Sequence, residues 1–183
     1  EGIDLSVDEI VARIEEWDTP HVVLTGGEPM LFAELIPLAD RIESMGRHIT
    51  IETAGTLYLP VACVLMSISP KLSNSAPSTA QSPRWSRRHD AARYRPEGMR
   101  RLLAEYSYQV KFVVETPVDV DEIEQYLTDF PEIDRERVLL MPQGTEVEQL
   151  ARIEDWLRPL STERGWSFCP RKHIEWFGLV RGT

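Results

Sequence analysis

Short apolar, β-branched runs alternate along this chain with segments of helical periodicity, and this alternation limits the fold more than any other feature. The short runs predict buried strands, and the segments between them predict amphipathic helices. Strands that alternate with helices form a parallel sheet, which is either open or barrel-like. We therefore predict an α/β fold in which residues 1–183 form a single domain. The five predicted strands are His21–Thr25, His48–Thr53, Val61–Ile68, Tyr108–Val114 and Arg137–Met141.

The predicted helices have identifiable starts and apolar stripes. Two capping boxes, Ser6–Glu9 and Thr145–Glu148, predict where the first and last helices begin. Pro37 lies inside the second helical pattern and predicts a bend or a break. Residues 54–60 are too few for a helix, so we expect either a loop or a lost helix between the second and third strands. The helical stripes lie in Val7–Trp17, Leu31–Met45, Asp119–Phe130 and Val147–Leu157.

Composition excludes several classes of protein. A hydrophobic fraction of 42% and a charged fraction of 27% are typical of a globular domain with a core. A net charge of −10 argues against a general affinity for nucleic acid or anionic membranes. No apolar run approaches the roughly 20 residues that a membrane-spanning helix needs, and no signal peptide is visible. Two cysteines form no disulfide framework, which fits a cytoplasmic location.

Residues 73–96 differ in composition from the rest of the chain. They are rich in Ser, Pro and Arg and poor in apolar residues, which predicts a long loop or a partly disordered insertion. Seven arginines lie between Arg84 and Arg101. We interpret them as a solvated surface, with an anion-facing patch as the alternative.

Polar sequences that contain Gly or Pro follow four of the five predicted strands. In parallel α/β proteins ligands bind at the carboxyl ends of the strands, so the fold would gather these segments at one rim. In the first segment two glycines let the backbone approach a ligand, and Glu28 adds a carboxylate suited to an amino group. Each segment taken alone is also compatible with an ordinary turn. The four segments are Thr25–Pro29 (TGGEP), Glu52–Thr56 (ETAGT), Ser67–Lys71 (SISPK) and Met141–Thr145 (MPQGT).

Several side chains in or near these segments have two interpretations. Glu52 is either a satisfied core carboxylate or a ligand contact. Lys71 either reaches solvent or pairs with a ligand carboxylate, and its neighbours favour the pairing. Lys111 lies in an apolar strand, so it is either buried with a partner or on an edge. Gln143 hydrogen-bonds either a ligand or its own loop, and for Ser69 the sequence favours neither a ligand nor the backbone.

The cysteines are weak candidates for chemistry. Cys63 is predicted to be a core residue rather than a reactive thiol. Cys169 and His173 suggest a metal site, but two ligands four residues apart make a poor one.

The strand-end motifs together resemble those of radical S-adenosylmethionine enzymes, and most closely the 7-carboxy-7-deazaguanine synthase family. TGGEP alone is typical of the superfamily, whereas ETAGT, SPK, MPQG and the tail in this order are more specific. The matching segments run from Val22 to the end of the chain. They are VVLTGGEPML (22–31), ITIETAGT (49–56), SISPKLSNS (67–75), QVKFVV (109–114), LLMPQG (139–144) and KHIEWFGLVRGT (172–183).

The resemblance implies a partial (β/α)6 radical S-adenosylmethionine barrel that lacks its first strand and its cluster loop. It also implies that Thr25 contacts a pterin substrate and that Thr183 reaches the substrate pocket. The residues that it implies for binding S-adenosylmethionine are Gly26, Gly27, Glu28, Ser69, Pro70, Lys71, Met141, Pro142, Gln143 and Gly144.

The implied reaction contracts 6-carboxy-5,6,7,8-tetrahydropterin to 7-carboxy-7-deazaguanine and releases ammonia, for queuosine or another 7-deazapurine pathway. A reduced [4Fe-4S] cluster would cleave S-adenosylmethionine, the resulting 5′-deoxyadenosyl radical would abstract a substrate hydrogen, and Mg²⁺ would assist the rearrangement. The resemblance further implies a homodimer and an external electron donor.

The cysteine content departs from the family's pattern. The cluster needs three cysteine thiolates from one loop, whereas this chain has only Cys63 and Cys169. We therefore expect the cluster loop, the first strand and the magnesium ligand to lie upstream of Glu1. We expect that the chain as given does not bind the cluster, and that the missing strand leaves a sheet edge unpaired.

Three alternative functions remain open. The first is another radical enzyme, or an activase, on the same scaffold. The second is a non-radical barrel enzyme in which Lys71 or Lys111 forms a Schiff base with a carbonyl substrate. The third is a non-catalytic module that keeps a nucleoside-type pocket and binds a protein partner.

Overall fold

One parallel sheet forms the centre of the molecule. The computed structural model describes residues 3–75 and 94–178. Within them six strands pair in chain order, and every neighbouring pair is parallel. The predicted α/β fold is therefore confirmed. The strands are β1 (His21–Leu24), β2 (His48–Thr53), β3 (Leu65–Ile68), β4 (Tyr108–Val114), β5 (Val138–Pro142) and β6 (Ser167–Phe168).

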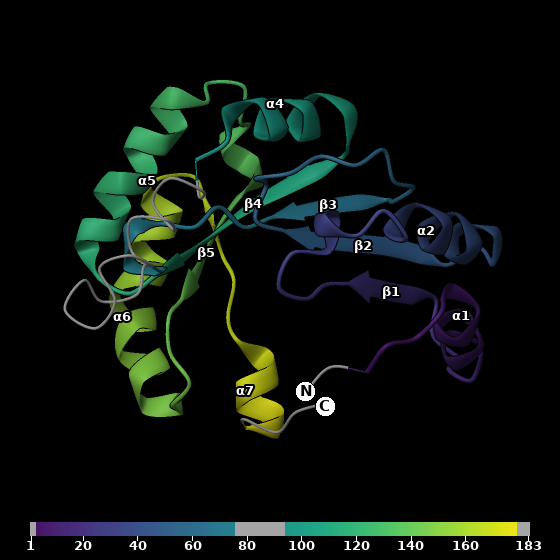
Figure 1. Cartoon of the computed structure of the whole chain (residues 1–183). Helices are drawn as coiled ribbons and strands as arrows, with labels where there is room; N and C mark the ends of the chain where they lie inside the picture. The colour runs from purple at the N-terminus through teal and green to yellow at the C-terminus, as the bar shows by residue number, and fades with distance from the viewer. Residues whose placement is uncertain (1–2, 76–93, 179–183) are drawn as a thin grey trace.

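Helices cover one face of this sheet. Figure 1 shows α2, α4, α5 and α6 along the outer side of the curved sheet, whereas α7 lies apart from them at its open side. The helices are α1 (Val7–Glu15), α2 (Leu35–Ser44), α4 (Pro96–Glu105), α5 (Pro117–Asp129), α6 (Val147–Glu163) and α7 (Lys172–Phe177). Three short 3-10 helices, η1 (Pro29–Leu31), η2 (Ser73–Ser75) and η3 (Arg135–Arg137), complete the described elements.

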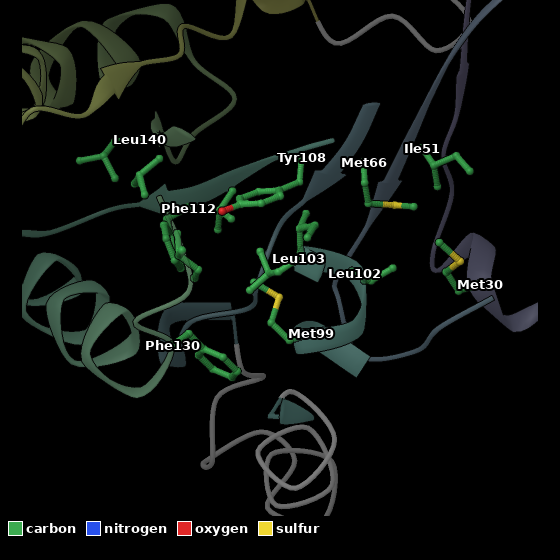
Figure 2. Packing of buried hydrophobic residues seen from close by; sticks show 14 of the residues in the cluster. Met30, Ile51, Met66, Met99, Leu102, Leu103, Tyr108, Phe112, Phe130 and Leu140 are labelled. Carbon is green, nitrogen blue, oxygen red and sulfur yellow. The ribbon is translucent and has the colours of Figure 1, made fainter. Parts of the chain in front are cut away.

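The core lies between the sheet and these outer helices. Burial alternates along β2, β4 and β5, so that every second side chain is buried and the others are partly open. Figure 2 shows strand residues such as Met66 and Phe112 packed near Met99 and Leu102 of α4. The alternation follows from the pleat, which points successive side chains to opposite faces. We call the partly open side, which carries Glu52 and Lys111, the inner face.

Three predicted strands have different bounds in the structure. The predicted strand His21–Thr25 is one residue too long, because β1 ends at Leu24. The prediction Val61–Ile68 is wrong in its first half, because pairing with β2 begins only where Thr50 lies opposite Leu65. Val61 is buried nevertheless, whereas the side chain of Val64 is 54% exposed. The last predicted strand is shifted by one residue, because Arg137 ends η3 and β5 begins at Val138. Strand β6, with only two residues, was not predicted.

The helix starts differ from the predictions in several places. The predicted capping box Thr145–Glu148 is wrong, because the N-cap of α6 is Glu146 and makes no side-chain cap hydrogen bond. The break in the second helical pattern comes before Pro37: η1 ends at Leu31, and α2 then places Pro37 in its first turn, where no backbone donor is lost. Trp17 lies beyond the end of α1 and is 68% exposed, so it does not belong to the apolar stripe.

The crossovers on either side of β3 resolve two further expectations. Residues 54–60 contain no helix, so the link from β2 is a loop. The predicted insertion 73–96 is too long at both ends, because Ser73 begins η2 and Pro96 begins α4, a helix that was not predicted. Arg100 and Arg101 form exposed ion pairs with Glu132 and Glu105, which supports a solvated surface for these two arginines. The rest of the insertion, 76–93, lies outside the described residues.

Removal of the Asp119 carboxylate should destabilise the domain, because this buried side chain holds the start of α5. Its Oδ2 accepts the backbone N–H groups of Glu115 at 2.7 Å and Thr116 at 2.8 Å. Asp119→Ala would leave both donors without this partner, and we expect a loss of about 2 kcal/mol in the free energy of unfolding. Urea denaturation measures it, with Asp121→Ala on the exposed side of the same helix as the control. Equal stability of the two variants would contradict the expectation.

Candidate active site

The carboxyl ends of the strands meet at one edge of the sheet, as the motifs predicted. The register places Leu24 beside Ile51, Thr53 beside Ile68, and Val114 beside Pro142. The N–H of Ser69 continues this ladder by donating to the carbonyl of Thr53 at 2.7 Å, and the N–H of Gln143 donates to Val114 at 2.7 Å. The four Gly- or Pro-containing segments therefore leave the sheet at the same rim.

The first segment exposes its backbone. Gly26 has φ 158°, and a Cβ placed at Gly26 or Gly27 would meet no atom within 4 Å. Both glycines line a hollow of about 710 Å³ that β1, η1, α1 and α2 border. Thr25 and Glu28 line it as well, together with apolar side chains such as Leu38. Open peptide groups beside an apolar wall suit a ligand with one polar and one apolar part.

The carboxylate of Glu28 is engaged within the protein. Its Oε1 accepts from the Thr53 hydroxyl at 2.8 Å and from the N–H of Met30 at 3.2 Å, while Oε2 accepts from the N–H of Ala54 at 2.9 Å. These bonds start η1 and join the first strand-end segment to the second. A contact between Glu28 and a bound ligand remains a prediction. The position of the carboxylate leaves the backbone of 25–27 as the more open part of this segment.

The inner face carries the side chains whose roles the sequence left undecided. Lys111 is largely buried and paired, which was one of its two predicted options: its Nζ donates to Oε1 of Glu52 at 3.1 Å, and its side chain is 14% exposed. The hydroxyl of Thr25 donates to the other oxygen of Glu52 at 3.2 Å. Beside them, the amide of Gln109 donates to the hydroxyl of Ser67 at 2.9 Å. These five residues come from β2, β3, β4 and the end of β1.

Arg171 holds the segment after β5, a role that sequence reasoning missed. Its Nε donates to the carbonyl of Pro142 at 2.9 Å, and Nη2 donates to Oε1 of Gln143 at 3.3 Å. Burial lowers the pKa of Arg171. Gly144 is buried with φ 147°, and a Cβ there would lie 2.9 Å from Oε1 of Gln149. Arg171 follows β6 along the chain. Because β6 has only two residues and shows no periodicity, no sequence pattern pointed to Arg171.

The remaining predicted site residues lie as follows. Ser69 is half-buried and Pro70 is buried directly after β3, whereas Lys71 is exposed. Met141 is half-buried on the inner face of β5. Thr183 lies outside the described residues.

Comparison with known proteins gives the family. No family model matches the chain. The chain is 39% identical over 184 residues to the 7-carboxy-7-deazaguanine synthase of Rhodopirellula baltica, which covers 100% of this chain and 71% of that protein. The chain belongs to the 7-carboxy-7-deazaguanine synthase family. The synthase of Halobacterium salinarum is 38% identical over 180 residues, with 93% of this chain and 70% of the relative covered.

Solved structures show the fold that this synthase family member shares. QueE from Escherichia coli superposes with a TM-score of 0.65 at 21% identity, covering 91% of this chain and 64% of that one. SuiB from Streptococcus suis, solved bound to S-adenosylmethionine, gives a TM-score of 0.59 at 13% identity and covers 93% and 45%. The predicted partial-barrel fold, with its parallel strands alternating with helices, is thus confirmed. This chain spans 64% of the length of the QueE chain.

The residues of this family member do not fit an iron–sulfur cluster on their own. A cluster is held by several cysteine thiolates, and the chain contains two cysteines. Burial raises the pKa of Cys63 to about 11 and also raises the pKa of Cys169, so both favour the neutral thiol. Over residues 3–75 and 94–178, no group of three or more His, Cys, Asp or Glu side chains is placed to hold a metal ion. The same part of the chain has no helix long and apolar enough to span a membrane.

Proposed function

We propose that the whole protein converts 6-carboxy-5,6,7,8-tetrahydropterin to 7-carboxy-7-deazaguanine with release of ammonia. The observation that carries this proposal is the 39% identity that extends over the whole of this chain to a synthase of that name. The convergence of all four motif segments at one rim supports it, because a small-molecule site in a parallel α/β fold lies there.

The strand-end segments then bind S-adenosylmethionine, which supplies the hydrogen-abstracting group when it is bound. The open backbone of Gly26 and Gly27 binds the methionyl part, and Glu28 fixes the shape of that segment. Residues 69–71 and 141–144 form the other cofactor contacts, the second of them held by Arg171. Thr25 contacts the pterin, and Thr183 completes its pocket.

The proposed reaction also needs an iron–sulfur cluster and Mg²⁺, and we propose that residues other than these 183 bind both. Since the two cysteines of the chain do not fit a cluster, we expect its thiolates, and the magnesium ligand, on residues other than these 183. We further propose a homodimer that takes electrons from an external donor in the cytoplasm and supplies a 7-deazapurine pathway such as that of queuosine.

Turnover by the whole protein tests the proposed function. Anaerobic incubation with the tetrahydropterin, S-adenosylmethionine, Mg²⁺ and a chemical reductant should yield 7-carboxy-7-deazaguanine and one ammonia per product, measured by mass spectrometry and an ammonia assay. The protein without reductant is the control. Cleavage of S-adenosylmethionine without deazaguanine would instead favour another radical enzyme or an activase. Binding of S-adenosylmethionine without its cleavage would favour a non-catalytic module.

A further inference from the structure

Arg171 is held in place by the elements on both sides of it. Before it, the N–H of Cys169 extends the pairing of β6 with β5 by donating to the carbonyl of Leu140 at 2.8 Å. After it, α7 begins, and the carbonyl of Arg171 accepts from the N–H of Ile174 at 3.0 Å. Its side chain therefore leaves a fixed stretch of backbone and reaches back to the segment that follows β5.

One guanidinium group contacts both the main chain and a side chain of that segment. Its Nε donates to the carbonyl of Pro142 at 2.9 Å, and its Nη2 donates to Oε1 of Gln143 at 3.3 Å. The donors of a guanidinium lie in one plane at fixed angles to each other. Arg171 therefore sets the direction of the Gln143 side chain relative to the backbone that carries it.

This contact also decides which end of the Gln143 amide is turned outwards. Arginine only donates hydrogen bonds, so the amide presents its oxygen to Arg171 and its NH₂ group on the other side. Gln143 is exposed, and within residues 3–75 and 94–178 its NH₂ group donates to no acceptor. Two N–H donors of known orientation are thus open to a ligand at the rim.

A structural role alone does not explain the contact. The backbone after β5 is already held, because the N–H of Gln143 donates to Val114 at 2.7 Å and the buried Gly144 packs against Gln149. The amide of an exposed glutamine would otherwise bond water, so its bond to Arg171 contributes little to folding. Burying part of a charged group has a cost, and burial accordingly lowers the pKa of Arg171. A role in ligand binding accounts for a cation at this place.

We propose that Arg171 is a positioning residue, which turns the amide of Gln143 so that its NH₂ group donates to the nucleoside part of S-adenosylmethionine. The inference rests on the proposed function, in which residues 141–144 contact that cofactor and Gly26 and Gly27 bind its methionyl part. The nucleoside part carries ring nitrogens and ribose oxygens, all of which accept hydrogen bonds. Arg171 thus orders the amide before the ligand arrives, which lowers the entropic cost of binding.

Gln143→Glu in the whole, cluster-loaded protein tests the direction of the amide. Glutamate still accepts from Arg171 but has no N–H to donate. The probes for calorimetry are S-adenosylhomocysteine and 5′-methylthioadenosine, which has the nucleoside but no amino acid part. Both should bind at least about tenfold more weakly, because a donor is lost and a carboxylate faces an acceptor. Stability against urea should not fall, since the contact with Arg171 is kept.

A double-mutant cycle tests whether Arg171 acts through Gln143. Arg171→Met should weaken both probes by about threefold to tenfold, the cost of ordering one free side chain. Arg171→Lys should restore part of this, because an ammonium group lacks the planar fork. In a Gln143→Met background, Arg171→Met should cost less than about a further twofold. Arg101→Met, which removes an exposed partner of Glu105 at 3.2 Å, is the control and should change nothing.

Unchanged affinity in a folded Gln143→Glu protein would overturn the inference. So would a full further loss from Arg171→Met in the Gln143→Met background, which would mean general support of the site, or a loss seen with S-adenosylhomocysteine but not with 5′-methylthioadenosine. Circular dichroism establishes the folded state, and Arg171→Lys takes the place of Arg171→Met if the latter does not fold. A protein that makes no deazaguanine but shows the expected losses keeps this inference and loses only the proposed reaction.

Discussion

Gly55→Ala should cost this domain about 3 kcal/mol of its free energy of unfolding. Gly55 has φ 76°, a left-handed conformation that costs a residue with a Cβ about 1 kcal/mol or more. The added Cβ would lie 2.7 Å from Cγ2 of Ile68 and 3.2 Å from Sδ of Met99. Both of these side chains are fully buried, so neither has space to move, and such overpacking costs about 1–3 kcal/mol.

Gly46→Ala is the matched control for this prediction. Gly46 also has a positive φ, 71°, but no atom lies within 4 Å of its added Cβ. It should therefore lose about 1 kcal/mol, for the backbone conformation alone. Urea denaturation of both variants measures the difference, which isolates the contact with Ile68. Equal losses would show that the core around Gly55 adapts to the methyl group.

Glu28→Ala should cost about 2–4 kcal/mol, because one carboxylate serves three donors from two segments of the chain. The variant removes the acceptor of the Thr53 hydroxyl and of the backbone N–H groups of Met30 and Ala54. A hydrogen bond to a charged acceptor contributes about 1.5–3 kcal/mol, and a buried donor left unpaired costs about 1–3 kcal/mol. Glu28→Gln should rescue little, since its NH₂ group would meet one of the donors.

Urea denaturation and amide hydrogen exchange at Ala54 measure the effect of Glu28→Ala. Faster exchange at Ala54 is expected, because its N–H loses a partner at 2.9 Å. Glu34→Ala is the control, since Glu34 is exposed and makes no cap hydrogen bond at the start of α2. If Glu28 served only to bind a ligand amine, its removal would leave stability and exchange unchanged.

Local sequence pattern was sufficient for most of the fold. The seven-residue alternation of Tyr108–Val114 predicted β4 to the residue, because its pleat buries every second side chain. The shorter elements escaped prediction. Strand β6 has only two residues, too few to show a period, and it forms because β5 offers it a partner. Helix α4 was missed because only three of its residues are buried and its exposed face continues an arginine-rich composition.

The sequence by itself determined the strand–helix order, the motifs at the strand ends and the family, because each is written in residues close together along the chain. The tertiary structure alone decided how the charged side chains of the site are used. Glu28 turns to Thr53, 25 positions away, and Lys111 pairs with Glu52, 59 positions away. These partners are set by the register of parallel strands and the loops between them, so no local pattern records them. The same register leaves the carboxylate of Glu52, rather than that of Glu28, as the accessible acceptor on the inner face.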